Sequence, residues 1–239
     1  MEKLISGAQK LGLYLSREQL EQFHIYYHEL VDWNRKVNLT SMTDYDEVQV
    51  KHFLDSLTVS MAMKSEDDSC LHIIDIGTGA GLPGIPLKIA LAGIRLVLVE
   101  ATAKKADFLR HLITKLGLDH IEIIVGRAEE IAHDTRYRES FDLVLSRAVA
   151  LLPALAELTL PFCKIGGTFV AQKKGDIGSE LNKAQRAITM LGGRLREVKS
   201  IGLPEFDDKR FLIIIDKVSP APHRYPRRPG MPAKRPITS

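Results

Sequence analysis

The chain contains few cysteines and no apolar run of membrane-spanning length. Cys70 and Cys163 are its two cysteines, and they are too far apart to form a C-x-x-C pair. A disulfide framework and a thiol redox motif are therefore excluded, and both residues should be reduced thiols in or near the core. No stretch approaches the roughly 20 apolar residues of a membrane span. The N-terminus lacks the basic, apolar and small-residue order of a signal peptide, which predicts a soluble cytoplasmic protein.

Metal-binding and nucleophile motifs are also missing. The eight histidines show no ligand spacing, so we predict no metal site. Cys163 follows an apolar run that should be helical, residues 153–162, and we assign it no catalytic role. His52 and Asp55 lie three residues apart on an expected helix and could form an acid–base pair, although such a pair is more often structural.

The net charge of +3 is concentrated at the C-terminus. Residues 219–239 hold five basic side chains and no acidic one, which leaves 28 basic against 30 acidic residues in the rest of the chain. Because this tail is rich in proline, it should be extended. Arg227 and Arg228 on such a scaffold, with Tyr225 for base stacking, would suit a nucleic-acid backbone with unpaired bases. A solubilising terminus is the alternative that composition leaves open.

The N-terminal part of the chain carries helix signals and no strand signal. Ser16 to Gln19 matches a capping box, and apolar residues then recur at helical spacing from Leu20 to Trp33. Asp44 offers a second N-cap before another apolar helix. We therefore expect a helical extension over residues 1–68, a main domain over 69–218 and the basic tail over 219–239.

An apolar strand from Leu71 runs through Asp75 into a glycine-spaced turn. Gly77, Gly79 and Gly81 would let the backbone approach a ligand where a Cβ atom would collide. A dinucleotide fold would place G-x-G-x-x-G directly after this strand, but the sixth position is leucine. A carboxylate beside the turn would repel a phosphate and suits an ammonium-bearing ligand such as S-adenosylmethionine. The order Asp-x-Gly-x-Gly-x-Gly resembles motif I of class I methyltransferases, although a shifted glycine register leaves NAD open.

Three later strand ends extend the predicted site, because open α/β sheets bind ligands at the carboxyl ends of their strands. Glu100 ends the second strand, where an acid hydrogen-bonds ribose hydroxyls. Ala128 and Glu129 follow the third strand, where they can meet an adenine edge, although Glu129 could instead cap a helix. Arg147 ends the fourth strand and could hold a substrate phosphate or the carboxylate of the donor.

The order of the elements predicts an α/β fold. We expect strands at residues 71–76, 94–100, 121–125, 141–145, 167–172, 195–201 and 211–218, and helices at 102–116, 153–162 and 179–191. Only residues 202–210 join the last two strands, which suits an antiparallel hairpin and cannot hold a crossover helix. A Rossmann-like, seven-stranded sheet with an antiparallel last strand is typical of class I S-adenosylmethionine-dependent methyltransferases and disfavours a dehydrogenase.

Six motifs together resemble the bacterial glucose-inhibited division protein B family, and the likeness spans nearly the whole chain. They are Trp33-Asn34 with Asn38-Leu39-Thr40, His52 to Leu57, Asp75 to Pro86, Gly126 to Glu129, Ser146 to Ala148, and Tyr225 to Pro232. The resemblance implies methyl transfer from S-adenosylmethionine to N7 of one guanosine in the 530 loop of 16S ribosomal RNA. The partner would be that RNA or the small ribosomal subunit, and we expect a monomer.

The resemblance and the strand ends together give a set of expected site residues. Cofactor contacts are expected at Gly77, Gly79, Leu82, Glu100, Ala128, Glu129 and Arg147, and RNA contacts at Arg147, Lys173, Lys174, Arg227 and Arg228. The chain lacks the Asp/Asn-Pro-Pro-Tyr sequence of enzymes that methylate exocyclic amines. Guanine N7 has a free lone pair and no proton to lose, so catalysis can rest on positioning without a general base. An NAD-dependent dehydrogenase and a non-catalytic RNA-binding protein are the alternatives.

Overall fold

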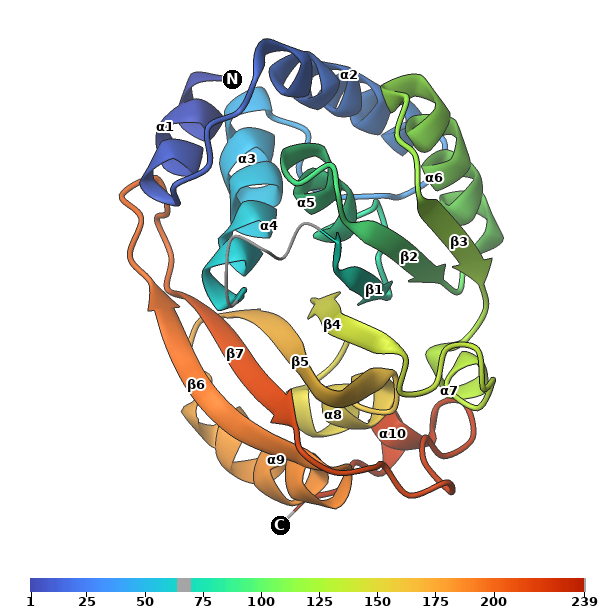
Figure 1. Cartoon of the computed structure of the whole chain (residues 1–239). Helices are drawn as coiled ribbons and strands as arrows, with labels where there is room; N and C mark the ends of the chain where they lie inside the picture. Colours follow the sequence, from blue (N-terminus) through green and yellow to red (C-terminus); the bar gives the residue numbers. More distant parts are fainter. Residues whose placement is uncertain (64–69, 239) are drawn as a thin grey trace.

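A seven-stranded sheet runs through the centre of the protein, with helices on both of its faces (Figure 1). The computed structural model describes residues 1–63 and 70–238. The strands are β1 (His72–Ile76), β2 (Arg95–Glu100), β3 (Ile121–Val125), β4 (Phe141–Arg147), β5 (Cys163–Lys174), β6 (Gly193–Ile201) and β7 (Arg210–Lys217), in the order β3-β2-β1-β4-β5-β7-β6.

The predicted antiparallel hairpin is confirmed. Strands β1 to β5 pair in parallel along the sheet, whereas β7 pairs antiparallel with both β5 and β6. Strand β7 therefore lies between β5 and β6. The carboxyl ends of β3, β2, β1 and β4 meet at one edge, as the prediction of the site requires.

The two cysteines differ in burial, and only one of them lies in the core as the sequence predicted. Cys163 does not follow a helix directly, because the preceding helix ends at Thr159 and Cys163 is the first residue of β5. It is buried, and burial raises the pKa of its thiol to about 12, so the thiol is uncharged near neutral pH. Cys70 is exposed, so its expected place in or near the core was wrong.

The helices surround the sheet, and two of them begin at N-caps that the sequence predicted. They are α1 (Glu2–Lys10), α2 (Arg17–Asn34), α3 (Tyr45–Val48), the π-helical η1 (Gln49–Leu54), α4 (Asp55–Leu57), the 3-10 helix η2 (Thr58–Ala62), α5 (Gly84–Ala90), α6 (Ala103–Leu116), α7 (Ala128–Ile131), α8 (Leu152–Thr159), α9 (Gly178–Met190) and α10 (Met231–Lys234). Ser16 forms the expected capping box with Gln19, and Asp44 caps α3. Within residues 1–63 and 70–238, no helix is long and apolar enough to cross a bilayer.

Alternate residues along the parallel strands face two separate hydrophobic cores. Ile73 and Leu96 pack with the N-terminal helices, α5 and α6, whereas Ile74 and Val97 pack with α8 and α9. Figure 1 shows these two helical layers on opposite sides of the sheet. The N-terminal helices therefore share a core with the sheet instead of forming a core of their own. The expected boundary between residues 68 and 69 lies outside the described residues.

The C-terminal tail packs against the sheet domain, so the prediction of an extended tail was wrong. Tyr225 is buried and contacts Met190 through its hydroxyl, so it is not free to stack on a base. Arg227 forms a two-pronged ion pair with the fully buried Glu157 of α8, with Nη2 2.6 Å from Oε2 and Nε 2.9 Å from Oε1. A buried carboxylate needs such a partner. The tail also contains the short helix α10, which the sequence did not predict and which can form because proline is tolerated in the first turn of a helix.

Replacing Arg227 tests how strongly the tail is anchored. The substitution Arg227→Ala leaves the Glu157 carboxylate buried without its partner, which should lower the free energy of unfolding by about 3 kcal/mol in urea denaturation. The neighbouring Arg228 is exposed, so Arg228→Ala should change it by less than about 0.5 kcal/mol. Identical unfolding curves for the two variants would show that the ion pair does not anchor the tail.

Candidate functional site

The glycine turn after β1 is held from inside by Asp75. Gly77, Gly79 and Gly81 all have positive φ angles, 70°, 59° and 92°, which favour glycine. Oδ2 of Asp75 accepts hydrogen bonds from the hydroxyl of Thr78 at 2.7 Å and from the backbone N–H of Gly84 at 3.0 Å. These bonds fix both ends of the turn.

Asp75 is fully buried, which corrects its expected role as a group that faces the ligand. Its Oδ1 has no hydrogen-bond partner among the described residues. Burial raises the pKa of this carboxyl from 3.8 to about 6, although its hydrogen bonds to Thr78 and Gly84 oppose the shift. The residue therefore acts on the loop and not on a ligand directly.

Two further side chains hold the same turn. Glu100 accepts hydrogen bonds from the backbone N–H of Gly79 at 3.0 Å and of Thr102 at 2.8 Å. Tyr26, from helix α2, donates its hydroxyl hydrogen to the carbonyl oxygen of Ala80. Burial raises the pKa of Tyr26, so the hydroxyl stays protonated and can donate. Sequence reasoning missed Tyr26 because an aromatic residue at helical spacing is typical of a core position.

A cleft of about 210 Å³ opens beside the glycine turn. It brings Gly77, Ala128 and Glu129 together, as predicted. Gly79, Leu82 and Glu100, which were also predicted to contact the cofactor, do not line the cleft. Gly77 has no space for a side chain, because a Cβ atom there would lie 2.5 Å from a methyl group of Val149. The other lining residues are Ile76, Val99, Ala101, Gly126, Arg127, Val149, Ala150, Leu158, Gly230, Pro232 and Ala233. We call this the donor cleft.

Glu129 does not cap a helix, because Arg127 occupies the N-cap position of α7. Its Oε1 instead accepts a hydrogen bond from the backbone N–H of Gly230, in the C-terminal tail, at 2.9 Å. The Arg127 guanidinium lies 3.7 Å from the same oxygen. This contact between α7 and the tail was not predicted, because the tail was expected to be extended.

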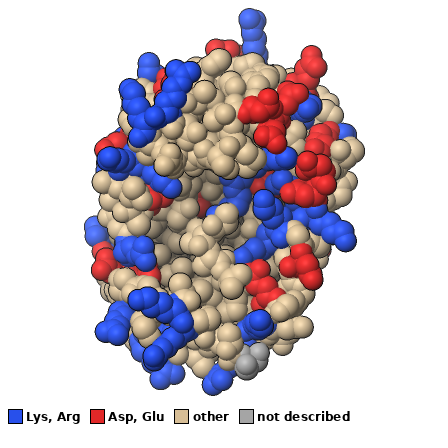
Figure 2. All heavy atoms as spheres, turned by 180° about the vertical axis from the view of Figure 1, so that it is seen from behind, with Lys and Arg blue, Asp and Glu red and all other residues tan. Residues whose placement is uncertain are grey.

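A second pocket, of about 450 Å³, lies at the ends of β4 and β5. It brings the predicted residues Arg147, Lys173 and Lys174 together. Its other lining residues are Met42, Lys51, His52, Asp55, Ala148, Gln172, Glu180, Asp208 and Arg210. We call it the cationic pocket. The molecule seen from behind shows Lys and Arg side chains gathered beside a hollow in its surface (Figure 2).

Asp55 organises the cationic pocket by pairing with two arginines. Its Oδ2 lies 2.9 Å from Nη1 of Arg147, and its Oδ1 lies 2.7 Å from Nη1 of Arg210. All three side chains are at most 15% exposed, so the pairs are largely shielded from water. Arg210 is the first residue of β7, and the sequence assigned no role to it.

His52 does not bond to Asp55, so the acid–base pair considered from the sequence does not form. Its Nε2 lies 2.7 Å from the hydroxyl of Thr40. Burial and the nearby Arg147 lower the pKa of His52 to about 4, and the imidazole is therefore neutral near pH 7. A neutral, hydrogen-bonded imidazole at this position is suited to orienting a neighbour.

The remaining predicted RNA contacts lie away from the cationic pocket. Arg227 is engaged by Glu157 and also donates to the carbonyl oxygen of Arg235 at 2.8 Å. Arg228 is exposed on the tail. Neither residue lines the pocket that holds Lys173 and Lys174. A role for Arg227 in RNA binding would require this buried ion pair to open.

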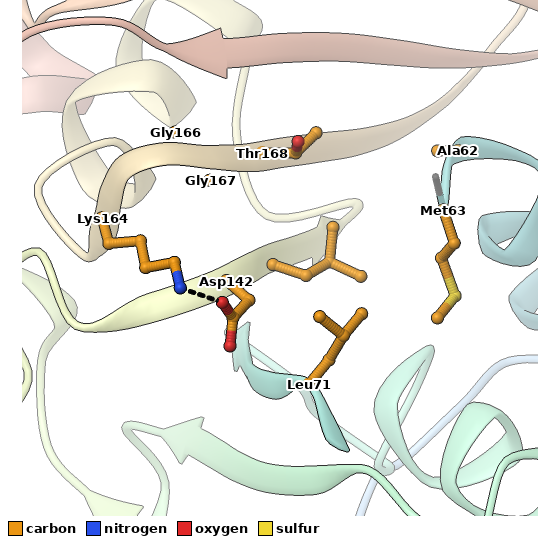
Figure 3. Close-up of a pocket in the computed structure, with 9 residues that line it drawn as sticks. Ala62, Met63, Leu71, Asp142, Lys164, Gly166, Gly167 and Thr168 are labelled. Carbon is orange, nitrogen blue, oxygen red and sulfur yellow. Dashed lines mark ion pairs between the residues drawn. The ribbon is translucent and has the colours of Figure 1, made fainter. Parts of the chain in front are cut away.

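A smaller hollow of about 110 Å³ lies near the amino ends of β1 and β4. Figure 3 shows Lys164 turned toward Asp142 across its mouth, with Leu71 and Met63 beside it. Ligands of parallel sheets bind at the opposite, carboxyl ends of the strands, so this hollow is not the candidate site. No group of His, Cys, Asp and Glu side chains in the described ranges is arranged to hold a metal ion.

The raised pKa of Asp75 predicts a pH dependence of stability. Because the folded pKa of about 6 exceeds the unfolded value of 3.8, the folded protein binds more protons between these values, and this group lowers stability as pH rises through that range. The variant Asp75→Asn removes the effect. Its free energy of unfolding relative to the original protein should rise by about 2 kcal/mol between pH 4 and pH 7. A pH-independent difference in denaturant titrations would contradict this origin.

Comparison with known proteins adds family evidence to this geometry. The family model described as GidB, rRNA small subunit methyltransferase G, matches residues 19–210. The protein named ribosomal RNA small subunit methyltransferase G from Dehalococcoides mccartyi is 49% identical over 99% of this chain and 100% of its own length. The protein of the same name from Pelotomaculum thermopropionicum is 46% identical over 99% and 98%.

Solved structures show a likeness in fold. An O-methyltransferase from Bacillus cereus in complex with SAH superposes with a TM-score of 0.57 at 19% identity, over 80% of this chain and 90% of that one. A precorrin-6y C5,15-methyltransferase from Geobacter metallireducens gives 0.52 at 19% identity, over 69% and 88%. Both likenesses support the predicted class I methyltransferase fold. The full-length relatives and the family match together show that this chain belongs to the GidB family, the rRNA small subunit methyltransferase G proteins.

Proposed function

We propose that this protein transfers a methyl group from S-adenosylmethionine to N7 of a guanosine in the 530 loop of 16S ribosomal RNA. The observation that carries the proposal is the pair of adjoining sites: the donor cleft and the cationic pocket are both lined by the loop after β4. Ala148 faces one of them and Val149 and Ala150 face the other. Relatives that match the whole chain are named for methylation of small-subunit ribosomal RNA.

The hydrogen bonds of the glycine turn favour S-adenosylmethionine over NAD. A dinucleotide fold offers free backbone N–H groups to a pyrophosphate. Here the N–H groups of Gly79 and Gly84 are bound to Glu100 and Asp75, and that of Gly77 donates to the carbonyl oxygen of Val99 at 3.0 Å. These N–H groups are therefore not free to bind a phosphate, which favours a donor without phosphate.

We propose that Gly77, Ala128 and Glu129 contact this donor. The close approach of Gly77 to Val149 leaves no space for a Cβ atom, and Ala128 presents a small side chain at the cleft. Gly79 and Leu82 are part of the same turn, and Glu100 accepts a hydrogen bond from the backbone N–H of Gly79. When bound, S-adenosylmethionine supplies a methyl group on a sulfonium centre that an unshared electron pair can attack.

The cationic pocket is proposed to hold the target nucleotide. Arg147 and Arg210 are fixed by Asp55, and Lys173 donates to the carbonyl oxygen of Ala150 at 2.7 Å. Such an array of oriented cations matches a phosphate-bearing ligand. Guanine N7 needs no deprotonation, so these groups have to position the base in line with the donor methyl, and positioning can supply roughly 7 to 11 kcal/mol.

We also propose how the three segments of the chain act together. The helical extension 1–68, the methyltransferase domain 69–218 and the tail 219–239 act as one monomeric unit in the cytoplasm, with 16S RNA or the small subunit as partner. The helical extension contributes Lys51, His52 and Asp55 to the cationic pocket, so it is part of the substrate site.

Turnover without a general base predicts that His52 is dispensable for proton transfer. The variant His52→Gln keeps a hydrogen-bonding side chain beside Thr40, and it should incorporate labelled methyl groups into small-subunit RNA within about tenfold of the original rate. A loss of a thousandfold or more, with folding, donor affinity and RNA affinity intact, would contradict a mechanism in which His52 is dispensable.

The salt dependence of RNA binding tests the cationic pocket. Lys174 is exposed and lines the pocket, so Lys174→Ala should weaken RNA binding and reduce the slope of log K against log salt by about one. Lys183, exposed on α9 and outside the pocket, provides the matched control Lys183→Ala. Equal slopes for both variants in a fluorescence titration would remove Lys174 from the interface.

A further inference from the structure

The C-terminal tail supplies one wall of the donor cleft. Gly230, Pro232 and Ala233 line it together with Gly77 and Ala128 from the strand ends. These two groups of residues are more than a hundred positions apart in the sequence, so the cleft exists in this form only when the tail is docked. Pro232 and Ala233 add apolar surface, which suits the flat purine end of an adenosine ligand.

Several contacts outside the cleft keep the tail in place. Beyond the pair between Arg227 and Glu157, Nε2 of His133 lies 2.8 Å from the carbonyl oxygen of Pro226. Arg138 donates to the carbonyl oxygens of Tyr225 and Ala221, each at 2.9 Å. These contacts connect the tail to the segment after β3 and to α8, the two elements that border the cleft.

One contact joins the tail to a predicted donor-binding residue. The backbone N–H of Gly230 donates to Oε1 of Glu129 at 2.9 Å. Gly230 has a φ angle of 80°, and a Cβ atom there would meet nothing within 4 Å, so glycine serves the conformation and not a close approach. Docking of the tail therefore sets the position of the Glu129 carboxylate.

We propose that residues 225–233 are part of the methyl-donor binding site. The segment closes the purine side of the cleft and positions Glu129, so binding of the donor and docking of the tail strengthen each other. The inference rests on the proposed function, because it takes the donor to be an adenosine derivative. The docked tail would then serve cofactor binding, whereas the sequence predicted an extended tail that contacts RNA.

A matched pair of variants on α10 tests the wall directly. Ala233 lines the cleft, whereas the exposed Lys234 beside it does not. In isothermal titration with S-adenosylhomocysteine, Ala233→Trp should weaken binding at least tenfold, and Lys234→Trp should bind within twofold of the original protein. Equal affinities for all three proteins would overturn the proposal.

Hydrogen exchange supplies a second readout that needs no substitution. Saturating S-adenosylhomocysteine should slow exchange of the amides of residues 225–233, and the same concentration of NADH should not. Protection confined to the strand ends, with the tail exchanging at its original rate, would contradict the coupling. If the unsubstituted protein bound no S-adenosylhomocysteine, the proposed function itself would fail, which distinguishes the two outcomes.

Discussion

The site depends on two buried carboxylates that hold a glycine turn by its backbone. Asp75 and Glu100 lie at the carboxyl ends of neighbouring strands. Glu100 accepts the backbone N–H of Gly79 in the turn, and Asp75 accepts that of Gly84 at the start of α5. Isolated buried charges are costly, and the raised pKa of Asp75 reflects this cost. The arrangement consumes the donors that a phosphate would use, so a Rossmann-like turn becomes a site for a donor without phosphate.

The helical extension and the tail complete the site from opposite sides of the sheet. Tyr26 reaches the glycine turn from α2, and Asp55 aims Arg147 and Arg210 into the cationic pocket. The tail closes the donor cleft through Gly230 and its neighbours. Segments that look like attachments in the sequence are therefore structural parts of the two pockets, which explains why the family likeness spans nearly the whole chain.

The sequence predicted those features of the fold and the site that depend on local patterns of residues. The antiparallel pairing of the last two strands, the N-caps at Ser16 and Asp44, and the meeting of Gly77, Ala128 and Glu129 follow from the short connection, capping and the rule of carboxyl-end sites. It could not predict pairings between distant residues. Asp55 with Arg210 and Glu157 with Arg227 depend on tertiary packing, and the proline content of the tail gave no sign of the buried acid that anchors it.

The most direct test of the account is the position of the methyl group. Small subunits from cells that lack this gene would be incubated with the protein and S-adenosylmethionine, and their 16S RNA would be treated with borohydride and aniline, which cleave at N7-methylguanine. We expect one new strand break, in the 530 loop. Methyl incorporation without any such break would contradict the assignment of N7 and require another acceptor atom in the cationic pocket.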